Sequence, residues 1–147
     1  MPHTSETIAI ASDHAGVDLK AQLIKELNAL GYTPLDLGTH STESVDYPDY
    51  AHAVAGKISS GETSRGIVIC GSGIGISIAA NRHTNIRAAL CHSGLDARLS
   101  RKHNDANVLA LGARIIGIEN AKDALRNFLS TEFEGGRHKK RVDKIEP

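Results

Sequence analysis

The sequence Gly66-Ile67-Val68-Ile69-Cys70, followed directly by Gly71-Ser72-Gly73-Ile74-Gly75, decides the fold. Residues 66–70 are apolar throughout, which indicates a strand buried on both faces, as the strands of parallel sheets are. The alternating glycines predict a sharp turn, and the apolar residues after them predict a helix that ends near Asn81. A buried strand, a glycine turn and a helix together form the basic unit of an α/β sheet.

The rest of the chain repeats this alternation of strands and helices. β-Favouring runs predict further strands at residues 7–11, 33–37, 86–91 and 107–111, and the second of these contains Pro34, which favours a sheet edge. Apolar spacing predicts helices at residues 19–30, 50–60 and 95–103 and near 121–128. We therefore predict one domain, residues 1–147, with a three-layer α/β/α Rossmann-like fold, a five-stranded parallel sheet and a basic C-terminal tail.

Composition and charge exclude several classes of protein. The 17 basic and 17 acidic side chains give a net charge of zero, so we predict no nucleic-acid partner, because polyanion binding depends on a basic excess. No apolar run reaches the roughly 18 residues of a membrane span, and the first residues lack the features of a signal peptide. Two cysteines are too few for a disulfide framework, although they could form one bond. We therefore expect a cytoplasmic protein without a membrane partner.

Candidate functional residues follow the strands at their carboxyl ends, where open parallel sheets bind ligands. They are Asp13 and His14 after the first strand, Cys70 and its glycine loop after the central strand, and Arg114 beyond the last strand. The loop has neither the glycine pattern of a dinucleotide site nor the lysine of a Walker A loop. Its amides and the following helix start suit a phosphate or an oxyanion. The alternative is a tight turn without a ligand.

Cys70 is a candidate base or nucleophile. Exposed amides and a helix N-terminus lower the pKa of a neighbouring thiol, so the glycine loop favours a reactive thiolate over a small buried side chain. Cys91 has no such loop, and we predict that it belongs to the core.

Two further groups of residues lie away from the strand ends. His103 and Asn104 come near the end of a predicted helix, where the histidine is either a proton shuttle or a solvated side chain. Residues 137–147 carry five basic and two acidic side chains. In a helix, Arg137 and Arg141 would share one face and could clamp a phosphate, whereas a frayed end would leave them solvated. No Cys/His cluster has the spacing of a zinc site, so we predict neither a metal nor another cofactor.

Five separated motifs resemble one enzyme family. They are Asp13-His14, residues 43–48, the loop and helix at 70–81, residues 100–109, and Glu134-Gly135-Gly136-Arg137-His138. In this order they are similar to the ribose-5-phosphate isomerase B family, which also includes allose-6-phosphate and galactose-6-phosphate isomerases. The resemblance spans the whole chain.

The resemblance implies a metal-independent aldose–ketose isomerase of the pentose phosphate pathway that acts through a cis-enediolate. Cys70 would move the proton between C1 and C2, while Ser72 and the loop amides would hold the enediolate oxygen. His103 would open the furanose ring, and Asp13 would shuttle protons between substrate oxygens. Residues 74–77 contain no acid, so the chain is similar to family members with a cysteine base. The substrate-binding residues implied by the family are His14, Tyr47, Gly71, Gly73, Ile74, Gly75, Asn104, Arg114, Arg137 and Arg141.

The family also implies a homodimer, or a dimer of dimers, in which each site draws on both subunits and the tail reaches its partner. The expected small-molecule partner is a sugar phosphate, with D-ribose 5-phosphate and D-ribulose 5-phosphate as the leading pair. Two alternatives stay open: an isomerase of allose or galactose 6-phosphate, and a non-catalytic module that binds a sugar phosphate. A binding module has no need for a thiolate facing a proton shuttle, so Cys70 and His103 favour an enzyme.

Overall fold

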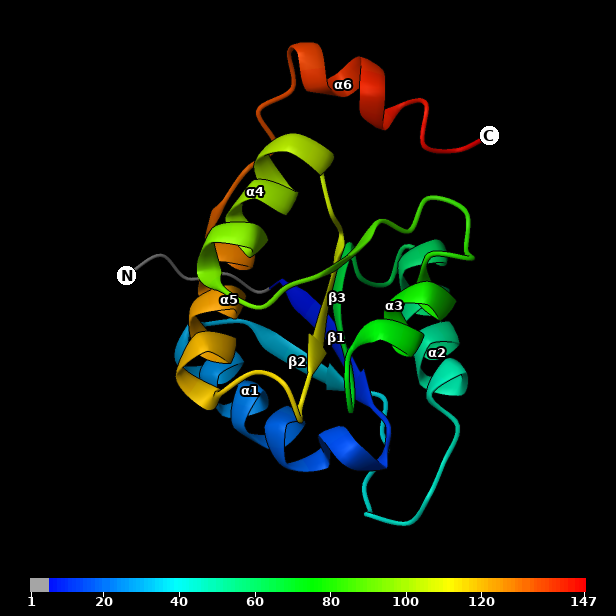
Figure 1. The fold of residues 1–147 in the computed structure, drawn as a ribbon, viewed down its shortest axis with the longest axis vertical. Helices are drawn as coiled ribbons and strands as arrows, with labels where there is room; N and C mark the ends of the chain where they lie inside the picture. The colour runs from blue at the N-terminus through cyan, green and yellow to red at the C-terminus, as the bar shows by residue number, and fades with distance from the viewer. Residues whose placement is uncertain (1–5) are drawn as a thin grey trace.

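The computed structural model describes residues 6–147 and confirms the predicted α/β architecture. Five parallel strands form one sheet in the order β2-β1-β3-β5-β4, and Figure 1 shows helices covering both of its faces. The elements are β1 (Thr7–Ser12), the 3₁₀ helix η1 (His14–Gly16), α1 (Val17–Ala29), β2 (Thr33–Asp36), α2 (Tyr47–Ser59), β3 (Arg65–Cys70), α3 (Ile74–Ala80), β4 (Ala88–Leu90), α4 (Gly94–Asn104), β5 (Val108–Gly112), α5 (Ile118–Ser130) and α6 (Arg137–Val142). No helix within residues 6–147 is long and apolar enough to cross a membrane.

β3 is the centre of the sheet. It pairs with β1 on one side and with β5 on the other. Ile67 and Ile69 pack against α1, α4 and α5, whereas Val68 and Cys70 pack against α2 and α3. Both faces of the strand are therefore covered, which is why its sequence is apolar without alternation.

α2 begins at Tyr47, three residues before its predicted start at residue 50. Pro48 lies in its first turn, where the missing N–H of proline breaks no helical hydrogen bond and its fixed φ suits the helix. Proline here starts a helix rather than prolonging the polar loop before it. The earlier helix start places Tyr47 beside the start of α3. A Cβ added to Gly75 would lie only 2.5 Å from Tyr47 Cζ.

β4 is shorter than predicted and covers only Ala88–Leu90. Side chains take over the backbone hydrogen bonds at its start. The N–H of Arg87 donates to Asn107 Oδ1, and the N–H of Ala88 donates to Asn81 Oδ1, both at 2.7 Å. The strand ladder therefore begins two residues later than the apolar pattern suggests, and the topology is unchanged.

A nearly buried ion pair ties the edge strand β2 to α1. Lys20 is 3% exposed, and its Nζ donates to both carboxylate oxygens of Asp36, at 2.7 and 2.8 Å. Asp36 also accepts the N–H of Gly38 at 3.0 Å. Burial works to raise the pKa of Asp36, but the hydrogen bonds from Lys20 and Gly38 outweigh it and hold that pKa below its ordinary value. The pair thus fixes the start of the loop that leads from β2 to α2.

We expect Lys20→Met to lower the free energy of unfolding at neutral pH. Removing one partner of a buried pair costs about 3–5 kcal/mol, and about 2 kcal/mol is expected here because the Asp36 side chain is 32% exposed. The lowered pKa of Asp36 stabilises the wild type above its unfolded value of 3.8, and this contribution is lost as the pH falls through the folded pKa. The variant should therefore lose less stability than the wild type between neutral pH and about pH 3.

Urea unfolding at the two pH values measures this effect. Lys57→Met is the matched control, because Lys57 pairs with Glu62 at 3.1 Å on the surface and should contribute less than about 0.5 kcal/mol. If both variants lost the same free energy of unfolding, the Lys20–Asp36 pair would stabilise the protein no more than an exposed ion pair does.

Candidate active site

Backbone hydrogen bonds join the carboxyl ends of three neighbouring strands. The N–H of Asp13 donates to Ile69 O at 3.0 Å, which holds the end of β1 to β3. The N–H groups of Ala113 and Arg114 donate to the carbonyls of Cys70 and Gly71, both at 2.9 Å, which holds the turn after β5 to the glycine loop. The predicted gathering of polar residues at this edge is therefore present.

Cys70 lies under the glycine loop and is 4% exposed. The N–H of Gly73 donates to its Sγ at 3.2 Å, so the loop presents a donor directly to the sulfur. Gly73 has a φ of +78° and is the residue before α3, so the helix start points back toward the thiol. Ser72 Oγ accepts the N–H of Ile74 at 3.1 Å, which orders the outer part of the loop. This arrangement places the Cys70 sulfur beside a backbone N–H and the start of α3.

Asp13 and His14 stand beside the loop at the end of β1. Asp13 is 6% exposed, and its Oδ1 accepts the N–H of Ala15 at 2.9 Å, so it caps η1. His14 Nδ1 accepts the N–H of Val45 at 3.2 Å. Because Nδ1 accepts, the proton of a neutral His14 is on Nε2, where it can be donated to an anionic oxygen. The same bond anchors the loop between β2 and α2 over the sheet edge.

Two glycines allow large polar side chains to approach the loop. A Cβ on Gly75 would lie 3.0 Å from Tyr47 Oη, and a Cβ on Gly71 would lie 3.4 Å from Arg114 Nη1. The structure thus brings together at one edge the predicted site residues Asp13, His14, Tyr47, Cys70, Gly71, Ser72, Gly73, Ile74, Gly75 and Arg114.

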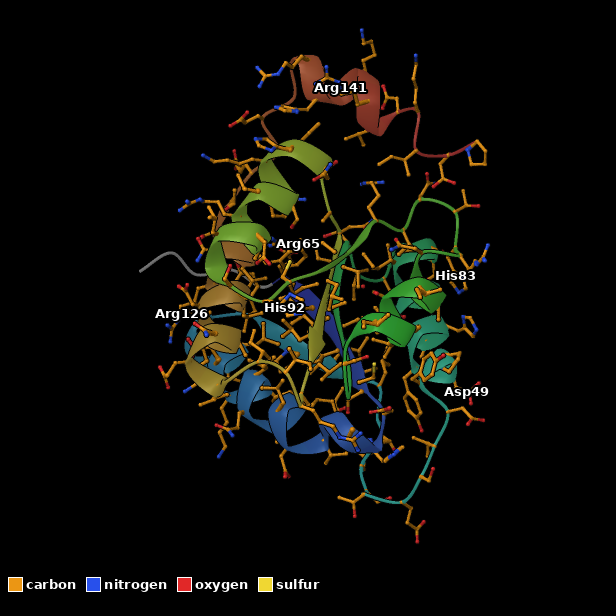
Figure 2. All side chains as sticks on the ribbon, viewed as in Figure 1. Asp49, Arg65, His83, His92, Arg126 and Arg141 are labelled. Atoms are coloured by element: carbon orange, nitrogen blue, oxygen red, sulfur yellow. The ribbon has the colours of Figure 1, made fainter. Side chains whose placement is uncertain are left out.

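The other predicted site residues lie at the opposite end of the molecule. α4 starts after the carboxyl end of β4 and returns to the amino edge of the sheet, so its 11 residues carry His103 and Asn104 about 16 Å away from that end. Figure 1 shows α6 beyond this end of α4, and Figure 2 labels Arg141 on it. Arg137 and Arg141 are both in α6, so the helical alternative for the tail is confirmed. Within one chain, His103 does not reach Cys70.

Cys91 belongs to the core, as predicted. It is 1% exposed and packs in the core beside α4 and α5. Burial, with a further contribution from the Asp96 carboxylate, raises the pKa of its thiol to about 12. Because its pKa is raised, the Cys91 thiol is unreactive at neutral pH. Neither cysteine forms a disulfide bond.

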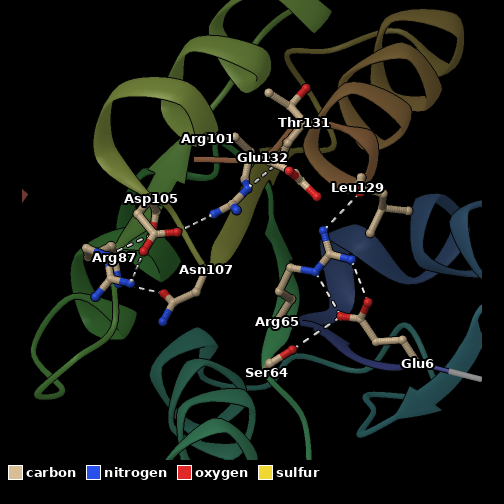
Figure 3. A pocket seen from close by; sticks show the side chains of 10 residues that line it. All are labelled: Glu6, Ser64, Arg65, Arg87, Arg101, Asp105, Asn107, Leu129, Thr131 and Glu132. Atoms are coloured by element: carbon tan, nitrogen blue, oxygen red, sulfur yellow. Dashed lines mark hydrogen bonds and ion pairs between the residues drawn. The ribbon is translucent and has the colours of Figure 1, made fainter. Parts of the chain in front are cut away.

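A polar cavity of about 450 Å³ lies at the amino edge, away from Cys70, and is drawn in Figure 3. Its arginines are engaged with acidic side chains. Arg65 donates to both oxygens of Glu6, at 2.7 and 2.9 Å, and Arg101 donates to Asp105 at 2.8 Å. Arg87 also lies 3.4 Å from Asp105. These pairs fasten the chain before β1 to β3 and hold the turn after α4 to Arg87, which precedes β4. We therefore assign the cavity a structural role rather than a phosphate site.

Comparison with known proteins decides the family. Residues 8–145 match the ribose/galactose isomerase family. Ribose-5-phosphate isomerase B of Escherichia coli is 48% identical over 138 residues, which cover 94% of this chain and 93% of that protein. The chain belongs to the ribose/galactose isomerase family.

Solved structures of ribose/galactose isomerases agree with this assignment. The ribose-5-phosphate isomerase B of Clostridium thermocellum superposes with a TM-score of 0.93 at 54% identity, covering 95% of this chain and 94% of that one. A ribose 5-phosphate isomerase of Thermotoga maritima gives a TM-score of 0.95 at 52% identity, covering 97% and 99%. The resemblance inferred from the five motifs is therefore confirmed.

The structure places two residues of the motif at 134–138 beside His103. The His138 ring stacks on that of His103, with centroids 4.4 Å apart, and Glu134 lies beside it. Glu134 and His138 are four residues apart in that motif. His103 is far from both along the chain, so spacing alone could not reveal the group.

Proposed function

We propose that this protein interconverts D-ribose 5-phosphate and D-ribulose 5-phosphate, with Cys70 as the base. The observation that carries the proposal is the Cys70 thiol, which sits under the glycine loop with the Gly73 N–H donating to its sulfur. The names of the relatives that align along nearly the whole chain support the same reaction. A tight turn without a ligand would not need this thiol.

The reaction moves one proton between carbons and one between oxygens. Cys70 removes the proton from C2 of the open-chain aldose and returns it to C1 of the enediolate. Asp13, next to Cys70 at the strand ends, carries the second proton from the C2 oxygen to the C1 oxygen. The Ser72 hydroxyl and the loop amides stabilise the charge that develops on the enediolate. No oxidant or reductant is needed, because the two protons and the shifted double bond balance.

Phosphate binding is proposed for cationic and donor groups at both ends of the molecule. At the carboxyl edge, His14 Nε2 and the Arg114 guanidinium can donate to phosphate oxygens. Arg137 and Arg141 add two bidentate donors from α6. Tyr47 and Asn104 complete the pocket wall.

A second copy of the chain is needed to bring the two ends together. The β4 edge of the sheet is flanked by exposed apolar side chains at helical spacing, Ile74 and Ile78 on α3 and Leu95 and Leu99 on α4, which are 38–57% exposed. Exposed apolar patches of this kind are typical of subunit interfaces. We propose a homodimer in which His103 and the arginines of one subunit face Cys70 of the other. There His103 opens the sugar ring before the proton transfer.

A substrate comparison tests the proposal. We expect the purified full-length protein to convert ribose 5-phosphate to ribulose 5-phosphate, with kcat/KM at least about tenfold higher than for allose 6-phosphate, since a pocket shaped for five carbons disfavours a sixth. Unphosphorylated ribose should be almost inert. A preference for allose 6-phosphate would favour a hexose-phosphate isomerase, and binding without turnover of either sugar would favour a binding module.

A further inference from the structure

Three potential metal ligands meet where α6 packs on the end of α4. They are His103 of α4, His138 of α6 and Glu134 of the segment between α5 and α6. Their ligand atoms all lie within 4.8 Å of one another, and Glu134 Oε1 is 3.5 Å from His138 Nε2. The N–H of Glu134 donates to Lys102 O at 3.1 Å, which holds this segment against α4. The cluster is therefore assembled by the fold and not by flexible side chains alone.

His138 supplies an independent sign that something binds here. The residue is 8% exposed, and its Nε2 is buried without a hydrogen-bond partner among residues 6–147. An unsatisfied buried nitrogen is unfavourable, and in native proteins such atoms usually have an ion, water or ligand as partner.

The spacing of the donors fits one transition-metal ion. Zinc binds imidazole nitrogen and carboxylate oxygen at about 2.0–2.2 Å in a tetrahedron, which places donors about 3.4 Å apart. In this cluster the ligand atoms lie within 4.8 Å of one another, and Glu134 Oε1 and His138 Nε2 are already 3.5 Å apart. We infer that His103, Glu134 and His138 form a site for a divalent transition ion of the zinc class, with a fourth position open to water or substrate.

An ion at this site would inhibit the isomerase. This consequence rests on the proposed function, in which His103 opens the sugar ring: a metal-bound imidazole nitrogen cannot exchange a proton with substrate. Arg137, Arg141 and Lys102 lie close by in the sequence and repel a cation, so the site is weaker than a structural zinc site. The same basic residues attract phosphate, so substrate and metal should compete.

Calorimetric titration of zinc chloride into the EDTA-treated full-length protein tests the site directly. We expect one ion per chain in the wild type and affinity at least about tenfold weaker in Glu134→Gln and in His138→Ala, because each removes a ligand. Glu132→Gln is the matched control: it makes the same charge change two residues earlier and should bind as the wild type does. Cobalt(II) should give the intense visible absorption of a tetrahedral site in the wild type and lose it in the two ligand variants.

Two other zinc-binding groups must be separated from this site. Cys70 is a free thiol, and His52 Nδ1 lies 2.7 Å from His83 Nε2 on the surface. Unchanged zinc affinity in Glu134→Gln and His138→Ala, or loss of binding in His83→Gln instead, would overturn the assignment.

Inhibition of ribose 5-phosphate turnover by zinc should follow the binding curve and be reversed by EDTA. Binding at the cluster without inhibition would refute the inhibitory role alone, and binding by a protein without isomerase activity would refute the proposed function while leaving the metal site intact.

Discussion

Replacing Cys70 with alanine is expected to lower kcat for ribose 5-phosphate by about 10³-fold, the middle of the range for loss of a general base. The proton on C2 is weakly acidic, and no acidic side chain lies in residues 74–77 to take over its removal. KM should change little, because the phosphate contacts are made by other residues. Steady-state kinetics with the purified variant measures both constants.

Cys91→Ala is the control that isolates the position of the thiol. Cys91 is as buried as Cys70, but the pKa of its thiol is raised to about 12, and it lies in the core. Its loss should reduce stability slightly and leave kcat unchanged. If Cys70→Ala kept more than about a tenth of the wild-type rate, Cys70 would not be the general base.

Gly73→Ala is expected to damage both folding and catalysis. Gly73 has a φ of +78°, and an added Cβ would lie 2.5 Å from Leu90 Cδ1 and 2.8–2.9 Å from the backbone of Leu111 and Gly112. The left-handed conformation and the steric overlap together should cost about 2–4 kcal/mol of unfolding free energy. The overlap also moves the N–H that donates to Cys70, so kcat should fall by about 10²-fold, as a misplacement of about 1 Å does.

Gly61→Ala separates the two causes of this effect. Gly61 has nearly the same φ, +80°, but nothing lies within 4 Å of an added Cβ. It should lose only the conformational part, about 1 kcal/mol, and none of the activity. Urea unfolding and kinetics of the two variants measure the difference. Equal destabilisation would mean that the close approach of β5 to the glycine loop has no energetic weight.

The sequence predicted the fold well because the decisive pattern is local. The run ending at Cys70 is buried on both faces, and Pro34 lies in an edge strand, as its missing N–H requires. The differences from the prediction also have local causes. Pro48 lies in the first turn of α2, which begins three residues before the predicted helix, and the side chains of Asn81 and Asn107 shorten β4. The start of α2 and the length of β4 both depend on a turn or a hydrogen bond, which the periodicity of apolar residues does not reveal.

The candidate site was predicted in part. Residues at the carboxyl ends of strands, such as Asp13 and Cys70, were expected at one edge and are found there, because strand polarity alone decides their place. The position of His103 follows from the return of α4 to the amino edge, which a list of motifs does not show. Its contact with His138 depends on how the tail packs, and no spacing in the sequence predicts it.

Two chains are proposed to share each active site, and a heterodimer of two inactive variants tests this proposal most directly. Cys70→Ala and His103→Ala chains, carrying different affinity tags, are co-expressed, and the heterodimer is purified through both tags. One of its two sites then has both Cys70 and His103, so activity should be roughly half that of the wild-type dimer, although both parent homodimers are nearly inactive. A heterodimer as inactive as its parents would contradict the shared site.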